Sequence, residues 1–150
     1  MEGLMNDVKL IRQYALAGKA VFTIVSGKTK KRYTYRINRA VKDKVPQQLW
    51  FVSIMYGTDN YKHYSYIGVI TTKGLFKRTE KSRYSELDGR VIAFRWWWKR
   101  VDKAYTKLTR KCDTFHSGHC GRCGKRLTVP KSILNGLGPI CNKYITGRNS

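Results

Sequence analysis

The chain has 150 residues, 41% of them hydrophobic, and carries 31 Lys and Arg against 9 Asp and Glu, a formal net charge of +22. This length fits one domain with a small addition, and an aromatic content of 13% is too high for a disordered basic tail. No apolar run reaches the roughly 18 residues that a membrane-spanning helix needs, and the chain lacks the basic-then-apolar start of a secretory signal. We therefore expect a cytoplasmic protein with no membrane partner.

The charge favours a polyanionic partner, because binding an anion relieves the self-repulsion of the folded chain. The last third, residues 99–150, is the most basic part, with 12 basic and 2 acidic residues. Nucleic acid, either DNA or RNA, is the expected partner. An acidic protein partner or a merely solubilising surface would carry the same charge.

The first predicted element is a short helix that begins after Asn6 or Asp7 and ends near Gly18. Two strands follow, over residues 20–26 and 32–37, and residues 49–56 and 64–70 repeat the pattern; residues 75–76 suit a short edge strand. We expect an antiparallel sheet of about four or five strands. The Gly-Lys-Thr turn after the first strand matches the end of a P-loop, but the motif's first Gly position is Phe22, so nucleotide hydrolysis is not expected.

Apolar residues then recur at spacings of three and four over residues 85–111, which predicts one long helix packed on the sheet. Its apolar stripe consists of Val91, Phe94, Trp98, Val101, Tyr105 and Leu108. Trp96 falls nearly opposite this stripe, where its ring either stacks on a nucleic-acid base or fills a gap against the C-terminal part. Its cationic neighbours are Lys99, Arg100 and Lys103.

The four cysteines indicate a metal site, because thiols stay reduced in the cytoplasm. Cys120 and Cys123 form a Cys-x-x-Cys pair with a glycine after each cysteine, which is typical of a zinc knuckle. Cys141, at the start of a predicted helix, is the expected third ligand. The fourth is His116, with Cys112 as its competitor. A redox pair is the alternative, but no βαβ pattern surrounds these cysteines.

The residues from His116 to Cys141 resemble the C-terminal signature of a family of small phage and prophage proteins of unassigned function. The resemblance rests on His116-x-Gly118-x-Cys120, Cys123-Gly124, Leu127-Thr128, Pro130, Ser132-Ile133, Gly136 and Gly138-Pro139-x-Cys141. It implies a phage origin, hence the cytoplasm of a bacterial host, and a treble-clef-like zinc module. The implied ligand set is His116, Cys120, Cys123 and Cys141. The resemblance does not point to any particular activity.

Together these patterns predict an α+β chain in two parts. Residues 1–111 form a domain with an antiparallel sheet and a Trp-bearing helix, and residues 112–150 form a zinc-binding module. The ion is expected to be structural Zn²⁺, because four protein ligands leave no open position and no carboxylate follows Asp113. We therefore expect no catalytic residues and no enzymatic activity.

The predicted function is regulatory nucleic-acid binding through cations that hold phosphates, with zinc fixing the backbone of the knuckle. The predicted contact residues are Arg122, Lys125, Arg126, Lys99, Arg100, Lys103, Trp96, Arg32 and Arg36. Arg32 and Arg36 share one strand face, which is either part of this track or a solvated surface. The alternative function is a host-takeover protein that binds and inhibits or redirects a bacterial protein, such as the transcription machinery.

Overall fold

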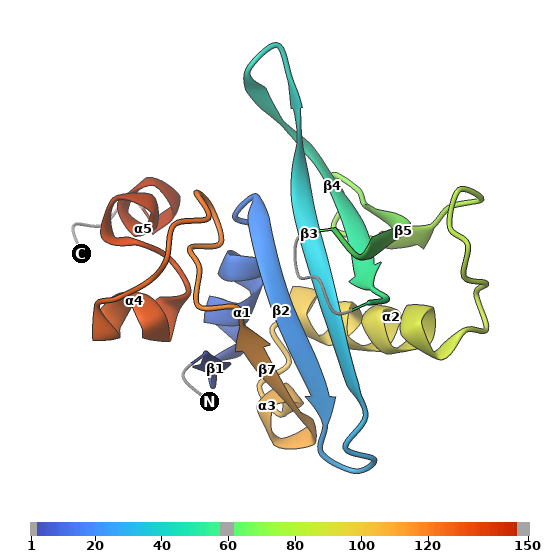
Figure 1. Ribbon diagram of the computed structural model, residues 1–150. Helices are drawn as coiled ribbons and strands as arrows, with labels where there is room; N and C mark the ends of the chain where they lie inside the picture. The colour runs from blue at the N-terminus through green and yellow to red at the C-terminus, as the bar shows by residue number, and fades with distance from the viewer. Residues whose placement is uncertain (1–2, 58–61, 147–150) are drawn as a thin grey trace.

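The computed structural model describes residues 3–57 and 62–146. Within these ranges seven strands form one antiparallel sheet in the order β1-β7-β2-β3-β4-β5-β6 (Figure 1). The strands are β1 (Leu4–Met5), β2 (Lys19–Ser26), β3 (Arg32–Lys42), β4 (Val45–Met55), β5 (Tyr64–Ile70), β6 (Phe76–Arg78) and β7 (Cys112–His116). The helices are α1 (Val8–Ala15), α2 (Gly89–Asp102), α3 (Leu108–Lys111), α4 (Pro130–Asn135) and α5 (Pro139–Thr146). The expected α+β class and antiparallel sheet are confirmed.

Helix α1 begins where the sequence predicts. The Asp7 carboxylate accepts a hydrogen bond from the Lys9 N–H at 2.8 Å, which satisfies one of the free amides of the first turn. Val8, Ile11 and Tyr14 recur at helical spacing and are buried. The helix therefore presents one apolar face to the sheet.

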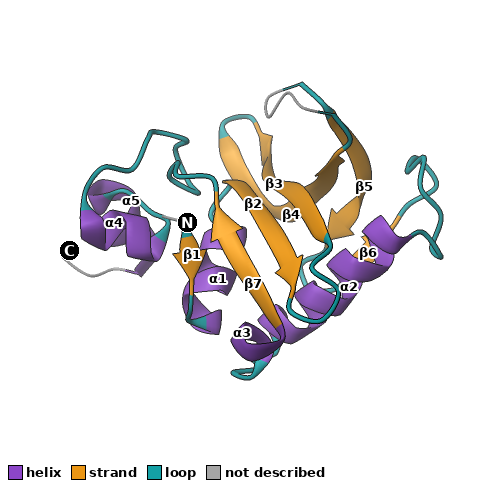
Figure 2. Cartoon of the chain, turned by 60° about the horizontal axis from the view of Figure 1, so that its bottom comes forward, coloured by secondary structure: helices purple, strands orange, loops and turns teal. Residues whose placement is uncertain are grey.

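The core lies on one face of the sheet, where α1 and α2 pack side by side (Figures 1 and 2). Strand β2 buries Phe22 and Ile24, and strand β3 buries Tyr35 and Ile37, because alternate side chains of a strand point to the same face. Phe22 stacks on Trp97 of α2 with 4.6 Å between ring centroids. This aromatic packing fixes α2 on the sheet.

The prediction of a single long helix over residues 85–111 is wrong. Helix α2 ends at Asp102, Ala104 has a left-handed φ of 51°, and a separate short helix, α3, begins at Leu108. The apolar period continues through this break because Leu108 still packs into the core. In the described part of the chain, no helix has the length and apolarity needed to cross a membrane.

Strands β1 and β7 are additions to the expected sheet. Strand β7 lies between β1 and β2, so the structure places the first residues of the expected zinc module in the sheet. Cys112, Thr114 and His116 are buried in alternation along β7. The Trp97 indole N–H donates to the Thr114 hydroxyl at 3.0 Å, which joins β7 to α2. Strand β7 thereby connects the sheet core to the C-terminal segment that follows it.

Candidate functional site

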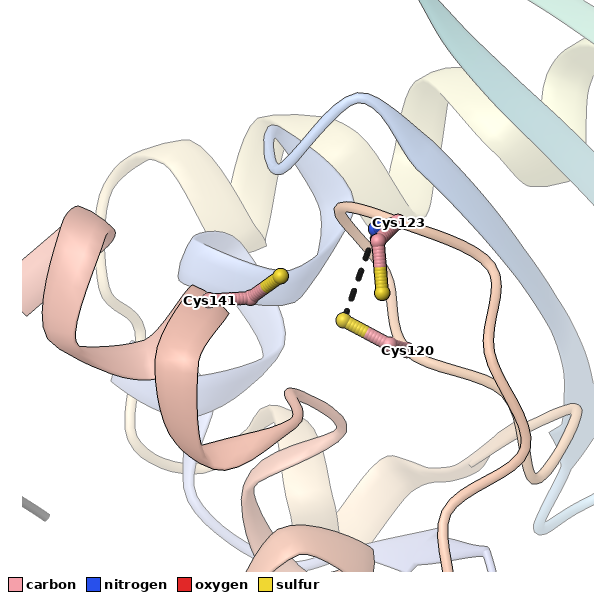
Figure 3. Close-up of side chains that lie close together, drawn as sticks. All are labelled: Cys120, Cys123 and Cys141. Atoms are coloured by element: carbon pink, nitrogen blue, oxygen red, sulfur yellow. Dashed lines mark hydrogen bonds between the residues drawn. The ribbon is translucent and has the colours of Figure 1, made fainter.

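The Cys-x-x-Cys pair lies in a tight turn held by backbone hydrogen bonds. The Cys120 N–H donates to the Lys125 carbonyl at 2.7 Å, and the Gly124 N–H donates to the Cys120 carbonyl at 2.9 Å. Gly124 has a φ of 82°, a left-handed conformation that glycine adopts without a steric penalty. The turn places the thiols of Cys120 and Cys123 on the same side (Figure 3).

Helix α5 supplies the third cysteine. It begins at Pro139, whose fixed φ suits the first helical position, and Cys141 lies in its first turn. The Sγ atoms of Cys120, Cys123 and Cys141 lie within 4.8 Å of one another (Figure 3). Thiolates bound to one tetrahedral zinc ion lie about 3.8 Å apart, since each Zn–S bond is about 2.3 Å. The three cysteines are therefore close enough to hold one metal ion.

Backbone amides favour ionisation of one thiol in this cluster. Burial raises the pKa of Cys120, but hydrogen bonds from the backbone N–H groups of Gly138, Cys123 and Arg122 outweigh it and lower the pKa to about 7. The N–H of Arg122 lies 3.4 Å from this sulfur and that of Cys123 lies 3.5 Å away. Burial raises the pKa of Cys141. The knuckle thus stabilises a thiolate, the form in which cysteine binds metal.

Tyr14 of α1 attaches this C-terminal segment to the sheet. Its hydroxyl donates to the Val21 carbonyl at 2.7 Å and accepts from the Val21 N–H at 3.0 Å. Its ring packs so closely against Gly121 and Gly136 that a Cβ at either glycine would collide with it. The Lys19 N–H also donates to the Gly121 carbonyl at 2.6 Å. The knuckle is therefore held in a fixed place beside β2.

His116, expected as the fourth ligand, lies outside the cysteine cluster of the described residues. Its Nδ1 accepts a hydrogen bond from the Gly118 N–H at 3.0 Å, and its Nε2 donates to the Ile133 carbonyl. Both ring nitrogens are thus engaged by backbone groups. Burial lowers the pKa of His116, consistent with this neutral imidazole. His116 connects β7 to the helix α4 rather than joining the thiols.

Cys112, the expected competitor for the fourth position, lies at the other end of β7 from His116. It is 5% exposed and belongs to the core between the sheet and α2. Burial, followed by the charge of Asp113, raises its pKa to about 11. The Cys112 thiol is therefore protonated at neutral pH and packs as a small apolar group. The described part of the chain brings only three of the five proposed ligands together.

We expect His116→Ala and Cys112→Ser to bind as much metal as the wild type, because neither side chain lies in the cysteine cluster. Elemental analysis of the purified variants should give the wild-type metal-to-protein ratio. His116→Ala should nevertheless lower the melting temperature, since it removes two hydrogen bonds worth about 1 kcal/mol each. Loss of metal from His116→Ala, to the level of a Cys123→Ser control, would identify His116 as a ligand after all.

The cations of the knuckle have different environments. The Arg122 Nη1 donates to the Cys141 sulfur at 3.4 Å, and its guanidinium lies 4.3 Å from the centroid of the Tyr144 ring. Arg122 is thus engaged at the cysteine cluster. Lys125 and Arg126 are exposed and line a cavity of about 360 Å³ beside the cysteines.

The cations at the end of α2 lie together. Lys99, Arg100 and Lys103 line a cavity of about 490 Å³, and Lys111 of α3 lines the same cavity. The Arg100 guanidinium lies 4.2 Å from the centroid of the Trp96 ring and donates to the Trp96 carbonyl at 2.9 Å. Trp96 is half-buried. The structure therefore places one of the three cations predicted beside Trp96, Arg100, against its ring.

The two arginines of β3 are not equivalent. Arg32 is exposed at the first position of the strand, whereas Arg36 is half-buried. The Arg36 guanidinium lies 4.4 Å from the centroid of the Tyr64 ring, on the neighbouring part of the sheet. In the described residues the ion pairs join Arg12 to Asp102, Arg90 to Asp88 and Arg95 to Glu86, so none involves a predicted contact residue.

Four cations that are not among the individually predicted contact residues line one cavity with Trp96. Lys28 and Lys31 come from the β2–β3 turn, and Arg110 and Lys111 come from α3. All four are exposed and line one cavity with Trp96. Their separation along the chain hides this grouping, although the high density of lysine in the turn was a usable signal.

Comparisons with known proteins identify a relative of one segment. No match was found among curated proteins or among solved structures. The C-terminal part of the chain, with His116 and the cysteine cluster, does match a family model. Residues 113–146 are similar to a family of unknown function, DUF6011, which confirms the resemblance to an uncharacterised family for this segment and leaves the phage origin and the zinc motif as predictions.

Proposed function

We propose that the chain is a non-enzymatic nucleic-acid-binding protein in which a structural zinc ion fixes the C-terminal segment. Cys120, Cys123 and Cys141 would hold the ion, because thiolates prefer soft metals such as zinc. Zinc would supply a rigid cross-link between the knuckle and α5. Three thiolates leave the fourth position of a tetrahedral ion to another group, but none of the described residues that line the cavity beside the cysteines is a carboxylate or a histidine that could activate a water there.

One observation carries the proposal: in two neighbouring cavities, every charged lining residue is a lysine or an arginine. We call this group the basic band, and it comprises Lys28, Lys31, Lys99, Arg100, Lys103, Arg110 and Lys111. Lys111 lines both cavities, so the band is continuous. Such a band fits the repeating negative charge of a phosphate backbone, and none of its members forms an ion pair among the described residues.

The salt dependence of binding tests this function. If the protein neutralises about six phosphates, the logarithm of the association constant should fall with the logarithm of salt concentration at a slope of about −5. Fluorescence anisotropy with a labelled oligonucleotide over about 50–200 mM salt measures this slope. A slope near zero would overturn the proposal.

The alternative is an acidic bacterial protein, which the same band would attract. Purification from a bacterial lysate with and without nuclease separates the two functions. We expect the bound material to be nucleic acid that nuclease removes. A stoichiometric protein that stays bound after nuclease treatment would instead favour the host-takeover function.

A further inference from the structure

A cavity of about 630 Å³ lies between the β2–β3 turn, α2 and α3. Its walls are largely apolar, with Ile24 and Tyr33 from the sheet and Ile92, Ala93 and Trp96 from α2. Its charged lining residues are Lys28, Lys31, Arg110 and Lys111. The volume is within the usual range for small-ligand sites, about 300–1,000 Å³.

The fold holds the two sides of this cavity together. The Gly27 N–H donates to the Lys111 carbonyl at 3.0 Å, and a Cβ at Gly27 would lie 2.9 Å from that oxygen. Ser26 pairs with Cys112 in the sheet, which fixes the turn against the end of α3. A Cβ at Gly89 would lie 3.1 Å from the Tyr33 hydroxyl, so glycine permits the approach of α2 to β3. A backbone hydrogen bond and strand pairing therefore hold the β2–β3 turn against α3 at this cavity.

The apolar side of the cavity is formed by α2, where Ile92 is exposed and Trp96 is half-buried with part of its side chain packed against the core. Ile92 is 48% exposed and lies one helical turn before Trp96, so the two side chains are neighbours on one helix face. Arg100 lies over the Trp96 ring on the side of the second cavity of the basic band. A flat aromatic group entering beside Trp96 would thus meet an apolar wall with cations on both sides.

The β2–β3 turn does not form a phosphate cradle of the P-loop kind. The Thr29 N–H donates to the Ser26 hydroxyl at 3.2 Å, the Lys30 N–H donates to the Ser26 carbonyl at 3.0 Å, and the Lys31 N–H donates to the Thr29 hydroxyl at 3.3 Å. These amides are used within the turn. Phosphates would therefore be held by the lysine and arginine side chains, which suits a strand better than a bound nucleoside triphosphate.

We propose that this cavity, which we call the base pocket, takes an unpaired base of a single-stranded nucleic acid. The inference rests on the proposed nucleic-acid binding and names the strand type. A base stacks on Trp96 or Tyr33 while the flanking phosphates contact the basic band on either side. Bases inside a duplex are stacked on one another and cannot enter a pocket of this kind without being extruded. The protein therefore prefers single strands to duplexes.

The test compares an oligothymidylate of about 15 nucleotides with a duplex of the same length. Trp96→Ala should weaken single-strand binding at least about fivefold and change duplex binding less than about twofold, because only an unpaired base stacks in the pocket. Trp96→Phe, which retains an aromatic ring, should restore most of the affinity. Phe51→Ala is the matched control, since Phe51 is a 41% exposed aromatic residue of β4 that lines none of the cavities described above.

Two further measurements keep the result clear. Circular dichroism melting checks that Trp96→Ala folds. If this variant does not fold, Ala93→Leu is used in its place. The larger side chain at position 93 fills the pocket and should weaken single-strand binding. Oligothymidylate should also quench wild-type tryptophan fluorescence more than it quenches that of Trp96→Phe. Failure of the wild type to bind either nucleic acid would overturn the proposed function. Salt-dependent binding that ignores strand type and the Trp96 variants, or equal quenching by polyglutamate, would overturn the base pocket alone.

Discussion

Chelation of the proposed metal ion at neutral pH is expected to unfold the C-terminal segment from about residue 117 to 146 while the sheet remains folded. Among the described residues, the hydrophobic cluster of this segment has four buried members, Cys120, Leu127, Leu137 and Cys141, and two of them are proposed metal ligands. Zinc binding in small modules of this kind contributes about 10–16 kcal/mol to folding. A cluster of this size cannot replace that contribution. We therefore expect the proposed metal to be the main source of stability for this segment.

Hydrogen–deuterium exchange measures this local unfolding. The knuckle amides of Cys120, Gly124 and Leu127, which are hydrogen-bonded in the folded segment, should exchange about 100-fold faster or more after chelation. Amides of α2 serve as the internal control and should keep their protection, because they belong to the sheet core. Unchanged exchange throughout the segment, with the metal demonstrably removed, would show that the cluster folds by packing alone.

Neutralising three cations of the basic band should weaken nucleic-acid binding about 100-fold at physiological salt. The variant is Lys103→Gln, Arg110→Gln, Lys111→Gln. For each phosphate contact that it loses, binding releases about one counterion fewer. At about 0.15 M salt each contact accounts for about fivefold in affinity, and the salt slope should become shallower by about 3. Anisotropy titrations against the wild type measure both quantities.

The matched control removes the same charge elsewhere. Lys42, Lys73 and Lys81 are exposed and lie outside the cavities of the basic band, so their replacement by Gln changes net charge equally. The affinity of this control variant for nucleic acid should fall about tenfold or less, because only the long-range electrostatic field of the protein is weakened. Equal losses in the two triple variants would show that total charge, and not the basic band, determines binding.

Local patterns predicted the elements whose structure depends on neighbouring residues. Asp7 caps α1 as its side chain predicts, and the alternation over residues 20–37 gives β2 and β3. The continuous helix over 85–111 was wrong because Leu108 keeps the apolar period although the backbone turns at Ala104. Strand β7 was missed because its cysteine and histidine suggested metal binding, while its alternating burial depends on pairing with β2.

The residues of the candidate site likewise fall into those that local spacing predicted and those that only the fold brings together. The thiols of Cys120 and Cys123 are brought together by a short turn, so their spacing alone predicted them. His116 could not be assigned from spacing, because the Ile133 carbonyl that engages its ring comes from α4. The base pocket depends on the contact of Gly27 with Lys111, which joins segments far apart in the chain. Its cations therefore became a group only in the folded structure.

The most direct test of the metal-organised knuckle is the zinc-to-protein ratio of the purified chain and of its single Cys→Ser variants. Elemental analysis should give about one zinc ion per wild-type chain and close to none for Cys120→Ser, Cys123→Ser and Cys141→Ser. Cys112→Ser is the matched control and should retain the wild-type ratio, because Cys112 lies in the sheet core. A wild-type chain without zinc, or a ratio that Cys123→Ser leaves unchanged, would contradict the account.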